Sequence, residues 1–164
     1  MSRRAGVLAG AALAAAVAVT AVSALAADEP APPKTTYELV DGMSAKSLFL
    51  LRCSGCHRTD GLGAPEAGVP PFPGSVGKIA RDGEGRAYLM HVPGVAGSGL
   101  KDAQLAAVMN YVLEEWAAEE AEPFTAEEVG RLRAAHIVDV VAYRRALAAR
   151  LAKNGVVIAD YPWP

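Results

Sequence analysis

Apolar residues recur along much of this chain at the three- and four-residue spacing that marks one face of an α-helix. The clearest case lies between residues 101 and 116, and the chain shows no repeat and no convincing sheet pattern. The apolar positions there, all expected to pack in a core, are Leu105, Val108, Met109, Val112, Leu113 and Trp116. This spacing predicts one long helix, and Pro123 closes the acidic stretch that follows it. Helices are thus the elements that the pattern predicts.

Two shorter helices are predicted upstream. Ser44 is a candidate N-cap for a helix that runs to Cys53. Residues 86–92 predict a short helix that ends at Pro93. Between these two helices, after residue 57, glycine and proline are frequent. Such residues predict a loop, and they allow the backbone to pass close to a flat ligand.

Residues 123–164 are predicted to form a helical extension of a domain that spans residues 37–122. The stretch from Thr125 to Glu128 matches a capping box, which starts one helix. A second helix is predicted from about residue 138 to residue 153. Its apolar stripe comprises Val138, Val141, Leu147 and Leu151. Because Pro123 breaks the chain before the capping box, we expect the extension to be an addition that is not needed to hold a cofactor.

The N-terminus is typical of an export signal. Arg3 and Arg4 precede an apolar run rich in alanine, and Ala24 and Ala26 are the small residues that a signal peptidase recognises. We therefore expect a signal peptide over residues 1–26 that is cleaved after Ala26. The alternative is an uncleaved anchor, since the apolar run is just long enough to span a bilayer. Residues 27–36 are rich in proline and are expected to form a linker.

The charge of the chain excludes one class of function. The formal net charge is −2, and removal of a signal peptide that carries two arginines makes the remainder more acidic. A chain of this kind lacks the basic footprint of a nucleic-acid-binding protein, so no nucleic-acid partner is expected.

The candidate chemistry is concentrated at Cys53-Ser54-Gly55-Cys56-His57. The C-x-x-C-H spacing is that of c-type haem attachment. Each thiol adds to one vinyl group of the haem as a thioether, and the imidazole that follows becomes the proximal axial ligand of the iron. The sequence therefore predicts one covalent haem c, bound through Cys53 and Cys56 and ligated by His57.

Two other interpretations of the paired cysteines fit less well. A thioredoxin-like redox pair lies beside a βαβ pattern, which is not visible in this chain. A tetrahedral zinc site needs four ligands. The chain has two cysteines, and its other histidines, His91 and His136, lie far apart in the sequence. Haem attachment is therefore the favoured interpretation.

The order of these motifs resembles class I cytochrome c over about residues 40–117. A helix leads to the Cys–His motif, and a helix with Tyr111 comes last. Between them stand Asp60-Gly61-Leu62-Gly63 and Pro70-Pro71-Phe72-Pro73-Gly74. The resemblance implies a small all-α electron-transfer protein of the bacterial periplasm, with a cytochrome c-like helical domain around one haem. It also implies that the first and last helices cross near the haem, with Phe49 against Tyr111.

The other groups around the iron are left open by the sequence. A metal-bound imidazole commonly donates its second nitrogen to a backbone carbonyl, and Pro70 or Pro71 is a plausible source. The family's usual second axial ligand is a methionine in the loop before the last helix, but residues 93–99 contain no Met, His or Lys. The nearest candidates are Met90 and, as the alternative, His91, which point about 100° apart on a helix. A sixth position without a ligand is the third possibility.

These observations predict a single-haem electron carrier and not an enzyme, because the sequence shows no second metal motif and no catalytic pair. The resemblance implies redox partner proteins in the periplasm, generically a dehydrogenase as donor and an oxidase or peroxidase as acceptor. A membrane is expected to be involved only if the N-terminal segment stays uncleaved. One alternative is a haem protein with an open sixth position that acts as a small-ligand sensor or weak peroxidase. The other is a haem subunit whose extension docks on a larger dehydrogenase.

Overall fold

A two-stranded hairpin opens the described part of the chain, which in the computed structural model comprises residues 39–161. The expected signal peptide and linker lie outside these residues. Strand β1 (Leu39–Val40) pairs antiparallel with β2 (Met43–Ser44). Asp41 and Gly42 join them with φ values of 53° and 82°, the positive values that a two-residue hairpin turn requires. Strands of two residues leave no alternating pattern, so the sequence signals this hairpin through the Asp41-Gly42 pair alone.

Helix α1 (Ala45–Arg52) starts at the predicted cap. The Ser44 hydroxyl accepts a hydrogen bond from the Ser47 amide at 3.1 Å. The buried face of the helix comprises Ala45, Leu48 and Phe49. The chain then turns at Cys53 into the single helical turn α2 (Ser54–His57), which carries most of the Cys–His motif.

The segment after α2 holds more helix than its glycines and prolines predict. It contains a 3-10 turn (Pro65–Ala67), α3 (Val76–Ala80), α4 (Gly83–His91) and α5 (Pro93–Ala96). Helix α4 begins earlier than expected because the Asp82 carboxylate caps it, accepting a hydrogen bond from the Gly85 amide at 2.9 Å. Helices α3 and α5 are too short to show a helical period in the sequence.

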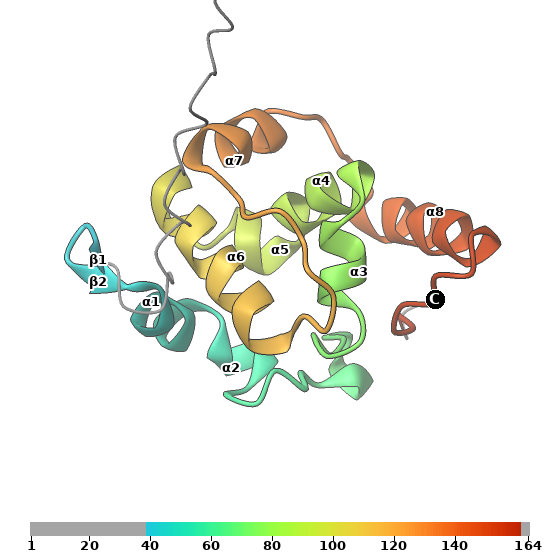
Figure 1. The fold of residues 1–164 in the computed structure, drawn as a ribbon, viewed down its shortest axis with the longest axis horizontal. Helices are drawn as coiled ribbons and strands as arrows, with labels where there is room; N and C mark the ends of the chain where they lie inside the picture. The colour runs from blue at the N-terminus through green and yellow to red at the C-terminus, as the bar shows by residue number, and fades with distance from the viewer. Residues whose placement is uncertain (1–38, 162–164) are drawn as a thin grey trace, which may run out of the picture. The chain divides into compact units, whose positions relative to one another are not determined.

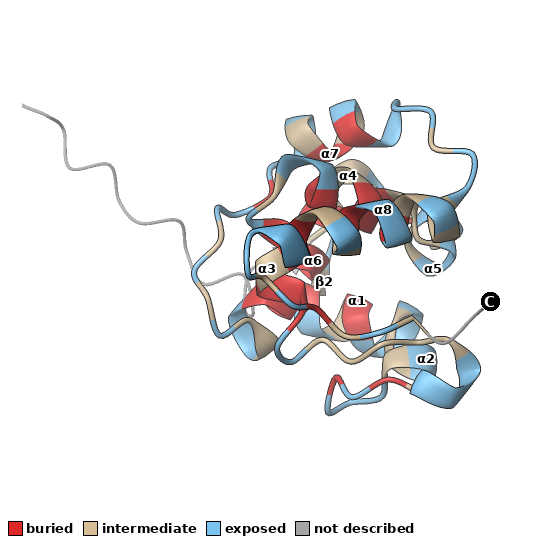
Figure 2. Ribbon diagram, turned by 90° about the vertical axis from the view of Figure 1, so that its right-hand side faces the viewer, coloured by how far each residue is buried: buried red, intermediate tan, exposed pale blue. Residues whose placement is uncertain are grey.

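The predicted long helix is confirmed as α6 (Asp102–Trp116). It packs on α1, α3 and α7 (Figure 1). Figure 2 shows that buried residues gather where α1, α3, α4 and α6 face one another. The implied contact between the first and last helices of the resembling region is present, since the ring centroids of Phe49 and Tyr111 lie 5.5 Å apart. The all-α prediction holds, with the short hairpin as an addition.

The C-terminal extension belongs to the same compact unit as the rest of the described chain. It comprises α7 (Ala126–Arg133) and α8 (Val140–Lys153), close to the predicted bounds. Asn110 of α6 forms two hydrogen bonds with the backbone of Phe124, at 2.6 and 2.9 Å. Arg86 of α4 is buried, stacks over the Phe124 ring and pairs with Glu128 of α7.

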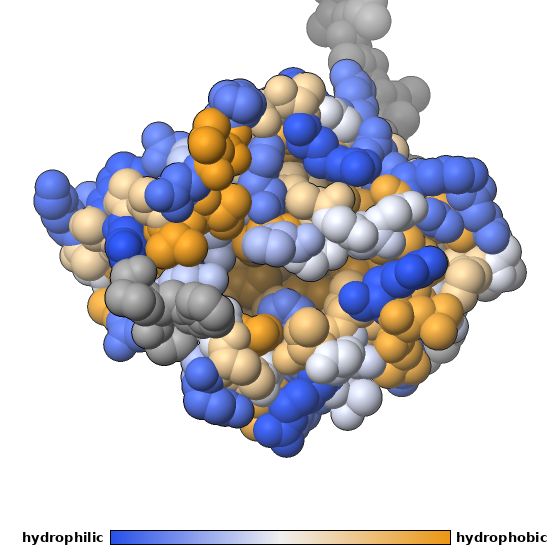
Figure 3. Space-filling model, turned by 180° about the vertical axis from the view of Figure 1, so that it is seen from behind, coloured by the Kyte–Doolittle hydropathy of each residue, from blue (hydrophilic) through white to orange (hydrophobic). Residues whose placement is uncertain are grey.

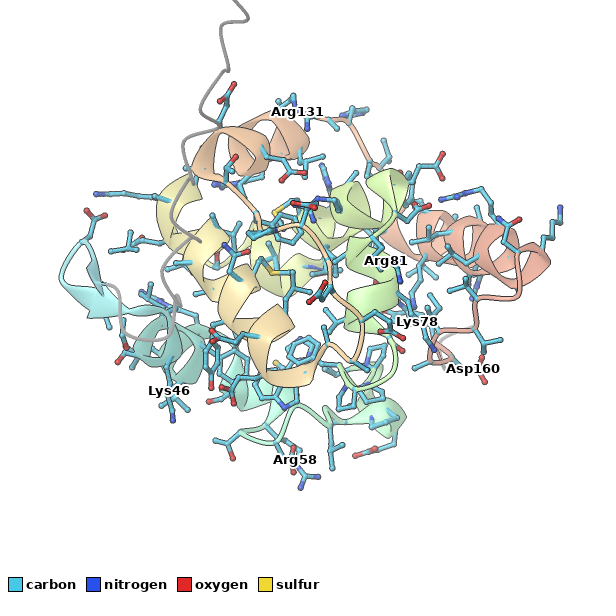
Figure 4. All side chains as sticks on the ribbon, in the orientation of Figure 1. Lys46, Arg58, Lys78, Arg81, Arg131 and Asp160 are labelled. Atoms are coloured by element: carbon cyan, nitrogen blue, oxygen red, sulfur yellow. The ribbon has the colours of Figure 1, made fainter. Side chains whose placement is uncertain are left out.

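Helix α8 and the segment after it are fastened to α3 and α4. Arg150 pairs with Asp82 at 2.6 Å, which joins α8 to the cap of α4. Lys78 of α3 donates to the Val157 carbonyl at 3.0 Å. Figure 4 shows Lys78 on the side of the protein where α8 and the last residues run. The extension therefore packs closely on the domain. Among the described helices, none is both long enough and apolar enough to cross a bilayer.

Candidate haem site

The cysteines and the histidine of the motif lie on one helical turn. The His57 amide donates to the Cys53 carbonyl at 2.9 Å, which closes this turn directly after α1. Cys53 is half-buried, Cys56 is exposed, and both are free thiols. Burial, together with the nearby Cys56 thiol, raises the pKa of Cys53 to about 11. The Cys53 thiol therefore keeps its proton at neutral pH until it reacts.

All three side chains line a cavity of about 330 Å³. This volume lies in the range of small-molecule and cofactor sites. The other walls come from the 68–76 loop, from α4 and the segment after it, from one face of α6 and from the C-terminal extension. Apolar side chains predominate in these walls, and Figure 3 shows the hollow with hydrophobic residues inside it.

A second, more open groove of about 1180 Å³ lies between Arg81, Arg86 and the acidic residues that follow α6. Its lining contains no cysteine, histidine or methionine. Since iron in haem proteins is held by such side chains, the smaller cavity is the one that fits the predicted chemistry.

The His57 ring is held as a neutral imidazole. It stacks on Phe72 with ring centroids 4.1 Å apart and an interplanar angle of 16°. Phe72 packs in turn against Trp116, with ring centroids 5.4 Å apart, which ties this loop to α6. Burial lowers the pKa of His57 to about 4, because desolvation disfavours the charged imidazolium. At neutral pH the ring therefore offers a nitrogen lone pair to a metal.

Glycine is required where the loop after the motif passes Trp116. Gly61 has a φ of +72°, and a Cβ at this position would approach the Trp116 ring to 2.7 Å. Only a residue without a side chain allows this approach at such a φ. Gly61 therefore allows the loop to pack closely against Trp116.

Pro70 and Pro71 both line the cavity. The predicted hydrogen bond from His57 to a carbonyl of this pair is not formed, and His57 Nδ1 is buried without a hydrogen-bond partner. The ring instead stacks on Phe72. An unpartnered buried nitrogen in a native structure calls for an explanation, and a nearby functional site is a common one.

Neither sequence candidate for the second axial ligand lies at the cavity. Met90 is 1% exposed and packs in the hydrophobic core, whereas its neighbour Leu89 lines the cavity. The ring nitrogens of His91 lie 2.8 Å from the carbonyl oxygens of Ala87 and Ala135. Packing between helices sets the rotation of α4 about its axis, and the sequence of so short a helix does not reveal that rotation.

A polar end of the cavity, built around Arg144 of α8, is missing from the sequence-based prediction. This side chain is 3% exposed and lines the cavity together with Ser75, Tyr88 and Tyr161. Its guanidinium donates to the Ala159 carbonyl at 2.6 Å and lies 5.4 Å from the centroid of the Tyr88 ring. In the part of the chain that the structure describes, no carboxylate pairs with Arg144. Arg144 therefore places a buried cationic side chain at this end of the cavity.

The sequence did contain a signal for this residue. Arg144 stands between Val141 and Leu147 in the apolar stripe of the extension, and a charged side chain on a buried helix face needs a partner. Val140 and Tyr161 of the extension also line the cavity. The expectation that the extension is not needed to hold a cofactor stays a prediction, although part of the extension lines the cavity.

Two known proteins are similar to this chain in sequence. Cytochrome c-552 of Thermus thermophilus is 35% identical over 120 residues, which cover 58% of this chain and 91% of that protein. A second cytochrome c-552, from a defined strain of the same species, is also 35% identical over 120 residues, which cover 80% of its length. No protein-family model matches the chain. This chain belongs to the class I c-type cytochromes.

The site of this cytochrome fits the haem c of the family. Cys53 and Cys56 supply two thiols, His57 supplies a neutral imidazole, and the apolar walls suit a porphyrin. Haem also carries two propionate carboxylates, and Arg144 lies buried at the cavity without a carboxylate of the described chain. The donor set and the unpaired guanidinium both agree with this cofactor.

Proposed function

We propose that this cytochrome is a single-haem electron carrier. The observation that carries the proposal is the convergence of Cys53, Cys56 and His57 on one apolar cavity. Haem c, when bound there, supplies reversible one-electron exchange at its iron. The two cysteines of the chain provide the thioethers for one such group.

The chain's own residues prepare the site for this exchange. Cys53 and Cys56 hold the cofactor covalently, so that the carrier keeps it through repeated encounters with partners. His57 presents a neutral imidazole as proximal ligand, because burial holds its pKa at about 4. The apolar walls exclude water, and burial of the site is one of the factors that set a haem's reduction potential.

Arg144 is assigned the role of holding a haem propionate. A propionate carboxylate would supply the counter-charge that the buried guanidinium lacks in the described chain. Ser75 and Tyr88 place hydroxyl groups at the same end of the cavity, and hydroxyl groups donate readily to carboxylates. The C-terminal extension would thereby close the haem pocket.

Export and partner binding complete the proposal. The N-terminal sequence supports a signal peptide cleaved after Ala26, which would place the carrier in the periplasm, where redox proteins would serve as donor and acceptor. The α1–α2 edge, defined by Lys46, Leu51, Arg52, Cys56 and Arg58, is its proposed docking surface. All five residues are exposed, and Figure 4 shows Lys46 and Arg58 pointing outward there.

A spectroelectrochemical titration of the purified protein tests the proposed function. We expect a single reversible wave with the slope of a one-electron couple, because one haem is held by one Cys–His motif. Irreversible loss of the haem spectrum during cycling, or a second wave of equal amplitude, would contradict a single-haem carrier.

A further inference from the structure

The wall of the cavity formed by the segment between α4 and α6 is made almost entirely of hydrocarbon. Its lining residues are Val92, Pro93, Gly94, Val95, Ser98 and Leu100. The Ser98 hydroxyl donates to the Val95 carbonyl at 2.8 Å and accepts from the Leu100 amide at 3.2 Å. The one hydroxyl of this wall is therefore already used in its own turn, and the wall presents no thioether or imidazole.

Two of the side chains with suitable donor atoms on the adjoining helices, Met90 and His91, are engaged elsewhere. Met90 is enclosed in the core, and the two nitrogens of His91 face the backbone carbonyls of Ala87 and Ala135. Helix α6 contributes Met109, which is 5% exposed and lines the cavity.

Met109 belongs to a continuous apolar row on α6. The lining residues of that helix are Leu105, Val108, Met109 and Val112, which share one face at helical spacing. Long side chains on a helix point back over the preceding turn, so Met109 lies over its neighbours in this row. We therefore interpret Met109 as one of the side chains that pack against the porphyrin, and not as an axial ligand of the iron.

We propose that the sixth coordination position of the haem is open and that the cavity admits a small neutral diatomic ligand, carbon monoxide or nitric oxide, to it. This inference rests on the proposed function, since it requires haem on Cys53, Cys56 and His57. A hydrocarbon wall suits an uncharged diatomic molecule, which needs no hydrogen-bond partner. The wall offers neither an acid nor a base, so it does not provide the acid–base pair that would cleave a bound peroxide.

Carbon monoxide titration of the reduced holoprotein tests this inference, with the haem spectrum as readout. We expect stoichiometric binding to the unmodified protein and the same affinity in Met90→Leu, whose side chain lies in the core and does not line the cavity. The oxidised protein is expected to show no sulfur-to-iron charge-transfer band. A wild-type protein that does not bind carbon monoxide overturns the proposal. If Met109→Leu then gains binding and loses a charge-transfer band, Met109 is the axial ligand instead.

A second variant locates the ligand at the proposed wall. Val95→Phe adds bulk to that wall, and we expect carbon monoxide affinity to fall by about tenfold or more while the haem stays attached, because overfilled cavities resist an added group. Unchanged affinity would show that the ligand enters elsewhere and would overturn the placement. A purified protein without covalent haem would instead refute the proposed function, which keeps the two failures distinct.

Discussion

At the scale of single residues, the main feature of the site is the burial of polar side chains that would be hydrated at the protein surface. Burial keeps His57 neutral by lowering its pKa to about 4, which prepares it as an iron ligand. Arg144 is also buried, at 3% exposure, and lines the same cavity. The Cys–His motif is legible in the sequence because its chemistry lies within five consecutive positions. Arg144 reaches the same cavity from α8, and only the folded chain brings the two together.

Replacement of Arg144 tests its assignment to a propionate. We expect Arg144→Gln to lower the midpoint potential at pH 7 by several tens of millivolts, because loss of a nearby cation disfavours the reduced state. A unit charge about 10 Å away is worth about 1–2 kcal/mol at an effective dielectric constant of about 20. Arg144→Lys keeps the charge and should shift the potential less. Equal shifts in both variants would show a purely structural role.

At the scale of elements, the sequence predicts what depends on local pattern and misses what depends on packing. Helix α6 is long enough to show its period, and Ser44 and Thr125 cap α1 and α7 as expected. The hairpin, α3 and α5 are too short to leave a pattern. The Met90 hypothesis depended on the rotation of α4, which contacts with α3, α7 and α8 determine. The packing of the extension was not visible in the sequence for the same reason, since its contacts are with α4 and α6.

Acidification should weaken the contact between α4 and α7. Its hydrogen bond with Arg86 holds the pKa of Glu128 below its ordinary value of 4.5. A carboxylate with a lowered folded-state pKa contributes stability above its unfolded pKa and loses it as the pH falls through the folded value. We expect Glu128→Gln to reduce the free energy of unfolding by about 1–3 kcal/mol at pH 7. This difference should disappear at low pH in denaturant titrations. A difference that persists unchanged below pH 3 would refute the ion-pair explanation.

At the scale of the whole molecule, an acidic protein presents basic side chains at the edge where its haem would be attached. Cys56 of α2 is exposed, and Leu51 of α1 is 68% exposed. Charge at such a surface governs the rate of encounter more than the final affinity. The location of the motif at the surface therefore suits exchange with partner proteins.

Charge reversal at this edge should change the rate of reaction with small charged oxidants. We expect Arg58→Glu to slow oxidation of the reduced protein by ferricyanide several-fold at low salt, since the anion loses an attractive charge. A cationic cobalt complex should react faster. Arg131→Glu makes the same charge change on α7, away from this edge (Figure 4), and should leave both rates nearly unchanged. Equal effects of the two variants would show that net charge alone steers the encounter.

The central claim is that one haem is bonded to Cys53 and Cys56, and the mass of the denatured polypeptide tests it most directly. The protein is produced in a host that attaches haem c, extracted with acidified acetone and weighed by mass spectrometry. The account predicts a chain that retains the mass of one haem, and a Cys53→Ser, Cys56→Ser variant that retains none. A wild-type chain that emerges at the mass of the bare polypeptide would contradict the account.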